Sequence, residues 1–132
     1  MRMKMSLLVL VLVLVRITAF AEELPKTSYG KYGGEMPAYE VYVDGQPLSI
    51  SSHDVFISIF ADKVVYSSAH LELSGAYTVF KQSKNDYVVK AQLSNGKSVN
   101  YEIEFTWNKK ENKIYLSARN GQAAAVLERM DS

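Results

Sequence analysis

The feature that most constrains the fold is a succession of short alternating segments between tight turns. From Val99 to Trp107, apolar and polar residues alternate strictly, which places one set of side chains in a core and the other in water. Similar segments fill the chain from Tyr39 onward, separated by turn residues such as Asp44-Gly45 and Asn95-Gly96. This pattern predicts an all-β domain of consecutive antiparallel strands.

The chain from Tyr39 onward has room for eight or nine such strands. We expect them at 39–43, 48–51, 54–60, 63–67, 76–81, 87–93, 98–107, 113–119 and 122–129. A meander of this length removes its edges most simply by closing into an up-and-down barrel of about eight strands. A two-sheet sandwich is the alternative.

Loop lengths predict how the later strands pair, because side chains on facing strand positions share a face. A three-residue loop, Ser94-Asn95-Gly96, sets Ala91 opposite Val99 and Val89 opposite Tyr101, with Gly96 at positive φ. In the next hairpin, Trp107 faces Ile114, and in the last one a two-residue Asn120-Gly121 turn brings 122–129 alongside. The further pairs expected are Phe105 with Leu116, Ile103 with Ala118, Glu102 with Arg119, Ala118 with Ala123, Leu116 with Ala125, Ile114 with Leu127, and Lys113 with Glu128. This agreement favours a strand over a helix at 122–129, despite its alanines.

The first 21 residues have the order of a secretory signal peptide. A basic start, Met1 to Met5, precedes the apolar run Ser6 to Val15, and Ala19-Phe20-Ala21 is a small-x-small cleavage site. Arg16 ends the run well short of the ~20 apolar residues of a membrane-spanning helix. We therefore expect a periplasmic or secreted protein with no stable membrane span after cleavage. Its parts are a signal peptide (1–21), an irregular N-terminal tail (22–38) and a single β domain (39–132).

Composition narrows the classes of partner. Cleavage after Ala21 leaves 111 residues with 12 Lys and Arg against 14 Asp and Glu, a net charge of about −2. No basic stripe remains, so a nucleic-acid partner is not expected. The chain has no cysteine, which excludes disulfides and zinc–thiolate sites and leaves stability to core packing.

The residue types needed for catalysis are present without a supporting arrangement. Ser51-Ser52-His53-Asp54 contains the residues of a hydrolase triad, but neighbours on a strand point to opposite faces. Glu102 and Glu104 share a face roughly 6–7 Å apart, where solvated charges are the simpler interpretation. The two histidines, His53 and His70, have no metal-ligand spacing. We expect neither an enzyme nor a metal or cofactor site.

Four segments resemble the small lipocalin-like (calycin-type) β-barrels of bacterial exported proteins. They are Leu73-Ser-Gly-Ala-Tyr-Thr-Val79, Tyr101-Glu-Ile-Glu-Phe-Thr-Trp107, Lys113-Ile-Tyr-Leu-Ser117 and Ala125-Val-Leu-Glu-Arg129. The resemblance is architectural and extends over residues 39–130. Lipocalins proper place a Gly-x-Trp near the first strand, whereas the only tryptophan here is Trp107. The resemblance implies a barrel that binds without catalysis.

Two functions follow as hypotheses. In the first, the protein binds a small apolar or amphipathic ligand between the large and small side chains of its inner face; the same side chains would equally serve to fill the barrel. The expected pocket wall is Tyr101, Ile103, Phe105, Trp107, Leu116 and Leu127.

In the second hypothesis, the protein is a binding module that inhibits or neutralises an exported enzyme or toxin. Its contact residues are then Tyr29 and Tyr32 on the tail, or Tyr115 and Val126 on the outer face. A structural role in the cell envelope is a third alternative. In each case, removal of residues 22–37 should leave the fold intact.

Overall fold

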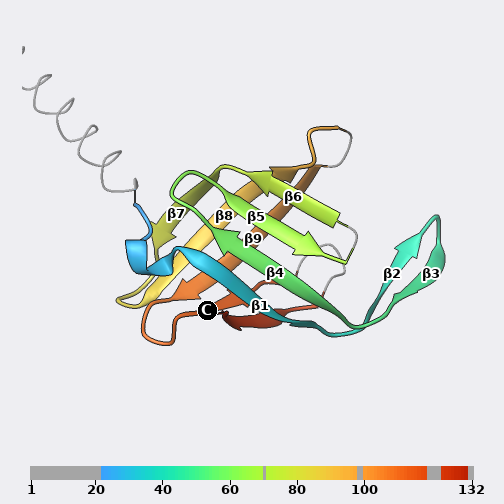
Figure 1. Ribbon diagram of the computed structural model, residues 1–132. Helices are drawn as coiled ribbons and strands as arrows, with labels where there is room; N and C mark the ends of the chain where they lie inside the picture. Colours follow the sequence, from blue (N-terminus) through green and yellow to red (C-terminus); the bar gives the residue numbers. More distant parts are fainter. Residues whose placement is uncertain (1–21, 70, 98–99, 119–122, 131–132) are drawn as a thin grey trace, which may run out of the picture.

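The computed structural model describes residues 22–69, 71–97, 100–118 and 123–130, and these residues form a nearly all-β protein (Figure 1). A short 3-10 helix, η1 (Lys26–Ser28), precedes the first strand. The strands are β1 (Gly30–Met36), β2 (Tyr39–Val43), β3 (Gln46–Ile50), β4 (His53–Ile59), β5 (Val64–Ser68), β6 (Leu71–Gly75), β7 (Tyr77–Lys81), β8 (Asp86–Ser94), β9 (Asn100–Asn108), β10 (Lys113–Leu116) and β11 (Ala125–Arg129).

Eight of these strands close into an antiparallel up-and-down barrel. The order around the barrel is β1, β4, β5, β6, β8, β9, β10, β11 and back to β1. The ring closes where Tyr32 of β1 pairs with Arg129 of β11 and where Ser74 of β6 pairs with Ser94 of β8. Strand β7 pairs with β8 outside the ring. The predicted barrel is confirmed in place of the sandwich.

The segment 22–38 is not the irregular tail that its glycines and prolines suggested. Residues 30–36 form β1, which pairs along its whole length with β4 and contacts β11 on its other side. Leu24, Tyr32 and Met36 are buried in the core. Because β1 lies between the first and last strands of the meander, the β domain begins well before Tyr39, and the barrel needs this segment to close.

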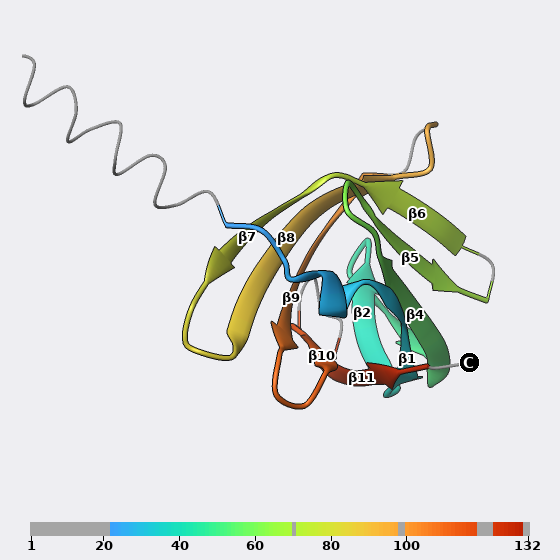
Figure 2. The same ribbon diagram turned by 60° about the vertical axis from the view of Figure 1, so that its left-hand side comes forward.

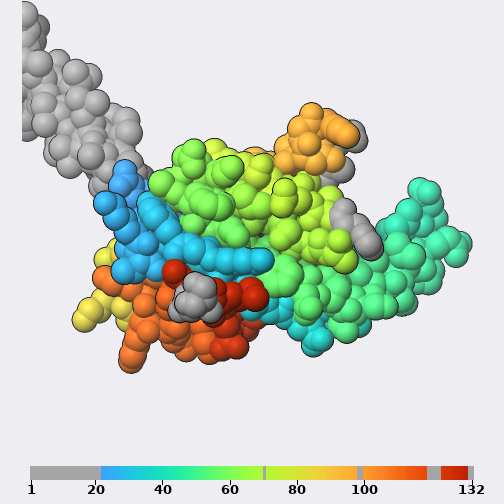
Figure 3. Space-filling view, in the orientation of Figure 1, coloured from blue at the N-terminus to red at the C-terminus, as the bar shows by residue number. Residues whose placement is uncertain are grey.

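Strands β2 and β3 form a hairpin of their own outside the barrel. Its register runs from Tyr39 opposite Ile50 to Val43 opposite Gln46, and it projects from the end of the barrel opposite η1 (Figures 1 and 3). The turn residues Asp44 and Gly45 both have positive φ, as a two-residue type I′ turn requires. The strands were correctly predicted here, but the expectation that they belong to the barrel wall was wrong.

The later registers test the predictions from loop length. Trp107 faces Ile114, Leu116 faces Phe105 and Ala125, and Ile114 faces Leu127, as expected. The β8–β9 register is different: Val89 faces Phe105 and Ala91 faces Ile103. The pairing of Ser94 with Asn100 excludes a loop confined to residues 94–96, although Gly96 does have positive φ. The predicted inward and outward faces of these strands were still correct, because the predicted and observed registers differ by an even number of residues.

Some sequence predictions fall outside these observations. Five of the predicted features lie outside the described residues: the signal peptide (1–21), His70, Val99, Arg119 and the Asn120-Gly121 turn. Residues 125–129 do form a strand, β11, as the pairing argument predicted. Strand β6 was not predicted.

Candidate functional site

The predicted ligand wall faces the inside of the barrel. Five of its residues are buried, and Tyr101 is partly buried against them. The Trp107 and Tyr87 rings pack with their centroids 5.6 Å apart. The buried wall residues are Ile103, Phe105, Trp107, Leu116 and Leu127. These side chains are therefore part of one hydrophobic core, and none of them lines the pocket beside Tyr29 and Tyr77 or the pocket beside Lys90 and Glu102.

The 3-10 helix η1 covers one end of the barrel (Figure 2), and a hydrogen bond from Tyr32 of β1 to Ser28 holds it there. The Tyr32 hydroxyl lies 2.8 Å from two acceptor oxygens, the Ser28 carbonyl and Asn112 Oδ1, and its single proton is donated to one of them at a time. It accepts from Trp107 Nε1 at 3.0 Å and from Arg129 Nη1 at 3.3 Å. Because Tyr32 is fully buried, it is not available to a partner, and its predicted role as a contact residue on a mobile tail is wrong.

Tyr29 lies at the same end, beside a surface pocket of about 520 Å³. The ring is partly buried against the core, so it is also not on a free tail. Tyr77 lines the same pocket and donates its hydroxyl proton to the carbonyls of Phe60, at 2.8 Å, and Ala61, at 3.3 Å. Tyr77 also lines a second pocket, of about 430 Å³, together with Lys90 and Glu102.

Three tyrosines gather at the opposite end of the barrel, where the hairpin leaves it. The rings of Tyr66 and Tyr101 have their centroids 6.2 Å apart, and Tyr39 at the base of β2 packs against the core. Burial raises the pKa of Tyr66 from 10.0 to about 12, with smaller contributions from the phenols of Tyr101 and Tyr39.

The predicted outer face is present as a row of side chains across five strands. Tyr115 faces Val126 on one side and Thr106 on the other, and the row continues through Val88 to Phe80. Tyr115 and Val126 are 38% and 47% exposed. Val88 is buried although it lies outside the core cluster. Tyr115 and Val126 do lie side by side on the outer face, and their role in binding stays a prediction.

The hairpin carries the two most exposed large apolar side chains of the described residues, Tyr42 and Val43, together with Leu48. Tyr42 is 70% exposed, Val43 52% and Leu48 49%. This site was not predicted, although the sequence contains a signal for it: Pro47 lies within β3, and a proline in a strand indicates an edge. Tyr42 also stands at a position of β2 where the alternation calls for a polar residue.

The residues considered for catalysis do not converge. The His53 ring hydrogen-bonds through Nδ1 to the Ser51 carbonyl at 2.9 Å. Glu102 accepts a hydrogen bond from Gln92, and Glu104 lies 3.8 Å from the Lys90 ammonium group. Among the described residues, no group of three potential ligands could hold a metal ion.

Comparison with known proteins adds no homologue. No protein-family model matches the chain, and neither a curated protein nor a solved structure is significantly similar to it. Within the described part of the chain, no helix is long and apolar enough to cross a membrane.

Proposed function

We infer that this protein is a non-catalytic binding module for another protein, and that the β2–β3 hairpin is its contact element. The observation that carries this proposal is the exposure of Tyr42, Val43 and Leu48 on a hairpin that projects from the barrel (Figure 3). Val43 and Leu48 lie on one face of the hairpin, and Tyr42, opposite Pro47, lies on the other. A two-stranded hairpin alone is marginally stable in water, and exposed apolar side chains on both of its faces favour an interaction site. A partner that covers these side chains would stabilise the hairpin as it binds.

The hairpin also offers main-chain groups to a partner. Strands β2 and β3 pair only with each other among the described strands, so each has an outer edge with unpaired amide and carbonyl groups. An extended segment of a partner can add to such an edge, with main-chain hydrogen bonds giving affinity and side chains giving specificity. Pro47 interrupts the β3 edge, which favours β2 as the edge that is extended.

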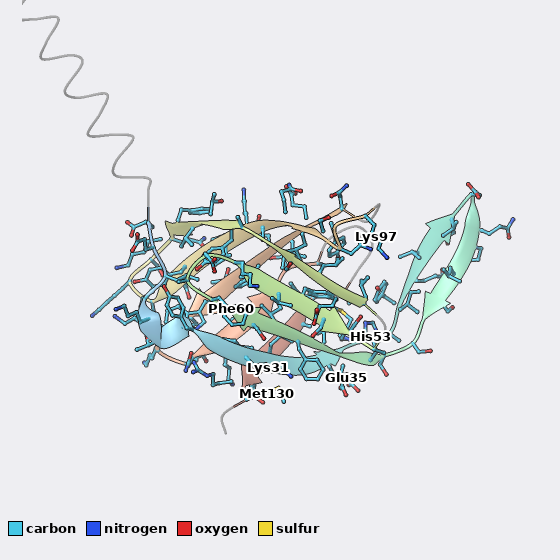
Figure 4. The ribbon with its side chains drawn as sticks, turned by 45° about the horizontal axis from the view of Figure 1, so that its top comes forward. Lys31, Glu35, His53, Phe60, Lys97 and Met130 are labelled. Carbon is cyan, nitrogen blue, oxygen red and sulfur yellow. The ribbon has the colours of Figure 1, made fainter. Side chains whose placement is uncertain are left out.

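Charge defines the kind of partner. Between Lys31 and Lys63 the chain has five carboxylates and no lysine or arginine. Glu40 and Asp44 lie on the hairpin. At its base Glu35 stands directly opposite Asp54 in the β1–β4 register, an arrangement that destabilises a sheet. Figure 4 shows Glu35 and His53 where the hairpin leaves the barrel.

A basic surface would relieve this repulsion and steer the encounter. We therefore assign the hairpin to a protein partner whose contact surface is apolar and flanked by lysine or arginine. An exported enzyme or toxin with an open apolar cleft fits this description, and a projecting hairpin that occupies the cleft would inhibit it. Export itself is supported by the order of residues in the first 21 positions.

The test places a photo-reactive phenylalanine at Tyr42 in the exporting cell, with the same group at Tyr115 as the matched position. We expect a discrete protein adduct from position 42 and none from position 115. The adduct should be lost in Glu40→Lys/Asp44→Lys and retained in the control Glu72→Lys, which alters an exposed carboxylate on β6. An adduct from position 115 alone would assign binding to the outer face. The absence of an adduct, or an adduct with twice the chain's mass, which indicates a second copy of the chain, would overturn the proposal of a basic protein partner.

The lipocalin-like resemblance stays a proposal about fold family. It is supported by the up-and-down barrel and by Gly30-Lys31-Tyr32 at the start of β1, where an aromatic residue follows a glycine at the spacing of Gly-x-Trp. A small-molecule function has one observation in its favour, the pocket beside Tyr29 and Tyr77. That site lies at the far end of the barrel from the hairpin and can be tested independently.

A further inference from the structure

We propose that the pocket beside Tyr29 and Tyr77 binds a small organic cation, an ammonium group attached to an apolar body. The pocket has a volume of about 520 Å³, within the usual range for small-molecule sites. It is independent of the hairpin and would stand even if the hairpin bound nothing. It differs from the predicted ligand site, because it lies outside the packed barrel interior.

The floor and sides of the pocket are apolar and aromatic. Leu24 and Val79 line it, and both belong to the buried core. Tyr29 and Tyr77 also line it while remaining partly exposed. The hydrogen bonds of Tyr77 to the carbonyls of Phe60 and Ala61 fix its ring beside the β4–β5 turn; Phe60 is labelled in Figure 4. An apolar body would find fixed contact surfaces here, and the tyrosine rings offer faces that attract a cation.

The charged side chains that line the pocket are all negative. Its lining includes the carboxylates of Glu22, Glu23 and Asp62, and no lysine or arginine. Cleavage after Ala21 would add the α-amino group of Glu22, one positive charge against three carboxylates, so the balance stays negative. Burial raises the pKa of Tyr77, and the phenol of Tyr29 and the carboxylates of Asp62 and Glu23 raise it further. Of these groups, the carboxylates of Asp62 and Glu23 carry the negative charge near the hydroxyl, and they make the potential in the pocket negative. A cation gains from this potential, whereas an anion of the same shape is repelled.

The ligand class is tested with three probes that share a six-carbon chain: hexyltrimethylammonium, hexanol and hexyl sulfate. Each is titrated into the purified protein while amide chemical shifts are followed by NMR. We expect saturable shifts of Tyr29, Asp62, Tyr77 and Thr78 with the cation. Affinity for hexanol should be lower by about tenfold, and hexyl sulfate should bind more weakly still.

Two variants separate charge from shape. Glu23→Gln/Asp62→Asn keeps the size of the lining and should weaken binding of the cation by about tenfold, while affinity for hexanol stays unchanged. Glu72→Gln, at a carboxylate outside the lining, should change neither. Equal affinity for all three probes would leave only an apolar depression and overturn the proposal. Shifts that map elsewhere, or no saturation with the cation, would also overturn it.

Discussion

Arg129 lies across the ring of Tyr32, with its guanidinium carbon 5.5 Å from the ring centroid. The same guanidinium donates to the Tyr32 hydroxyl and, at 3.1 Å, to the carbonyl of Thr27 just before β1. The last strand of the barrel therefore holds both the first strand and η1. Gly30 is needed for this approach, because a Cβ at its position would meet the guanidinium group at 2.6 Å.

Tyr32→Phe tests how much this junction stabilises the fold. The substitution removes the hydroxyl that bonds Ser28, Asn112 and Trp107 and leaves buried polar groups with fewer partners. We expect the free energy of unfolding to fall by about 1–3 kcal/mol in urea denaturation. Tyr29→Phe, on the same segment, should change it by less than about 0.5 kcal/mol. Equal losses would contradict a special role for the Tyr32 hydroxyl.

Removal of residues 22–36 should abolish folding. Without β1, the strands β4 and β11 lose their shared neighbour, and the core loses Leu24, Tyr32 and Met36. We expect the shortened chain to lack the cooperative thermal transition of the intact protein when followed by near-ultraviolet circular dichroism. A native spectrum would instead restore the idea of a peripheral tail.

The hairpin, in contrast, should be dispensable for folding. Met36 faces His53 in the β1–β4 register, so Asn-Gly in place of residues 37–52 completes a two-residue hairpin. The main packing loss is the contact of Tyr39 with the core. We expect a folded barrel that is less stable by at most about 2 kcal/mol, measured by urea denaturation. An unfolded product would show that the hairpin contributes to the core.

Gly75→Ala should destabilise the barrel at its β6–β8 contact. A Cβ at Gly75 would collide with the carbonyl oxygen of Gln92, which is backbone and cannot turn away. At Gly33 a Cβ would meet the ends of the Met130 and Phe56 side chains instead, and these can rotate. We expect Gly75→Ala to cost about 1–3 kcal/mol, and Gly33→Ala clearly less, by thermal denaturation. A reversed order would argue against the close approach of the two strands.

Stability should fall at high pH through Tyr66. Its pKa is about 12 in the folded protein against 10.0 for the model phenol, so the folded state retains the proton more strongly than the unfolded state. The contribution is fully present below pH 10.0 and is lost as the pH rises to about 12. Urea denaturation across this window should be less pH-dependent in Tyr66→Phe. Parallel pH profiles for the two proteins would rule out this assignment.

Alternation and loop length were sufficient to predict the register of the last three strands, β9, β10 and β11. In the β9–β10 and β10–β11 pairs, one register places apolar pairs inside and Lys113 beside Glu128, whose charged groups lie 3.4 Å apart. In the β8–β9 pair, a shift by an even number of residues preserves both faces. Local pattern therefore predicted that Val89 faces inward but not that its partner is Phe105.

The sequence by itself determined the fold class, the inward and outward faces of the later strands and the turn at Asp44-Gly45, because these depend on contacts between neighbours in the chain. Only the tertiary structure decided that residues 30–36 close the barrel. Gly33 and Gly34 break the pattern of alternation there. Glycine is present because Phe56, Leu127 and Met130, which are distant in the sequence, approach the backbone closely at these positions. Only the tertiary structure also decided that the hairpin lies outside the barrel and that a pocket forms beside Tyr77. The closure of the barrel decides which strands stay outside the wall and which side chains line the pocket. Closure joins residues that are far apart in the sequence, so local pattern does not predict it.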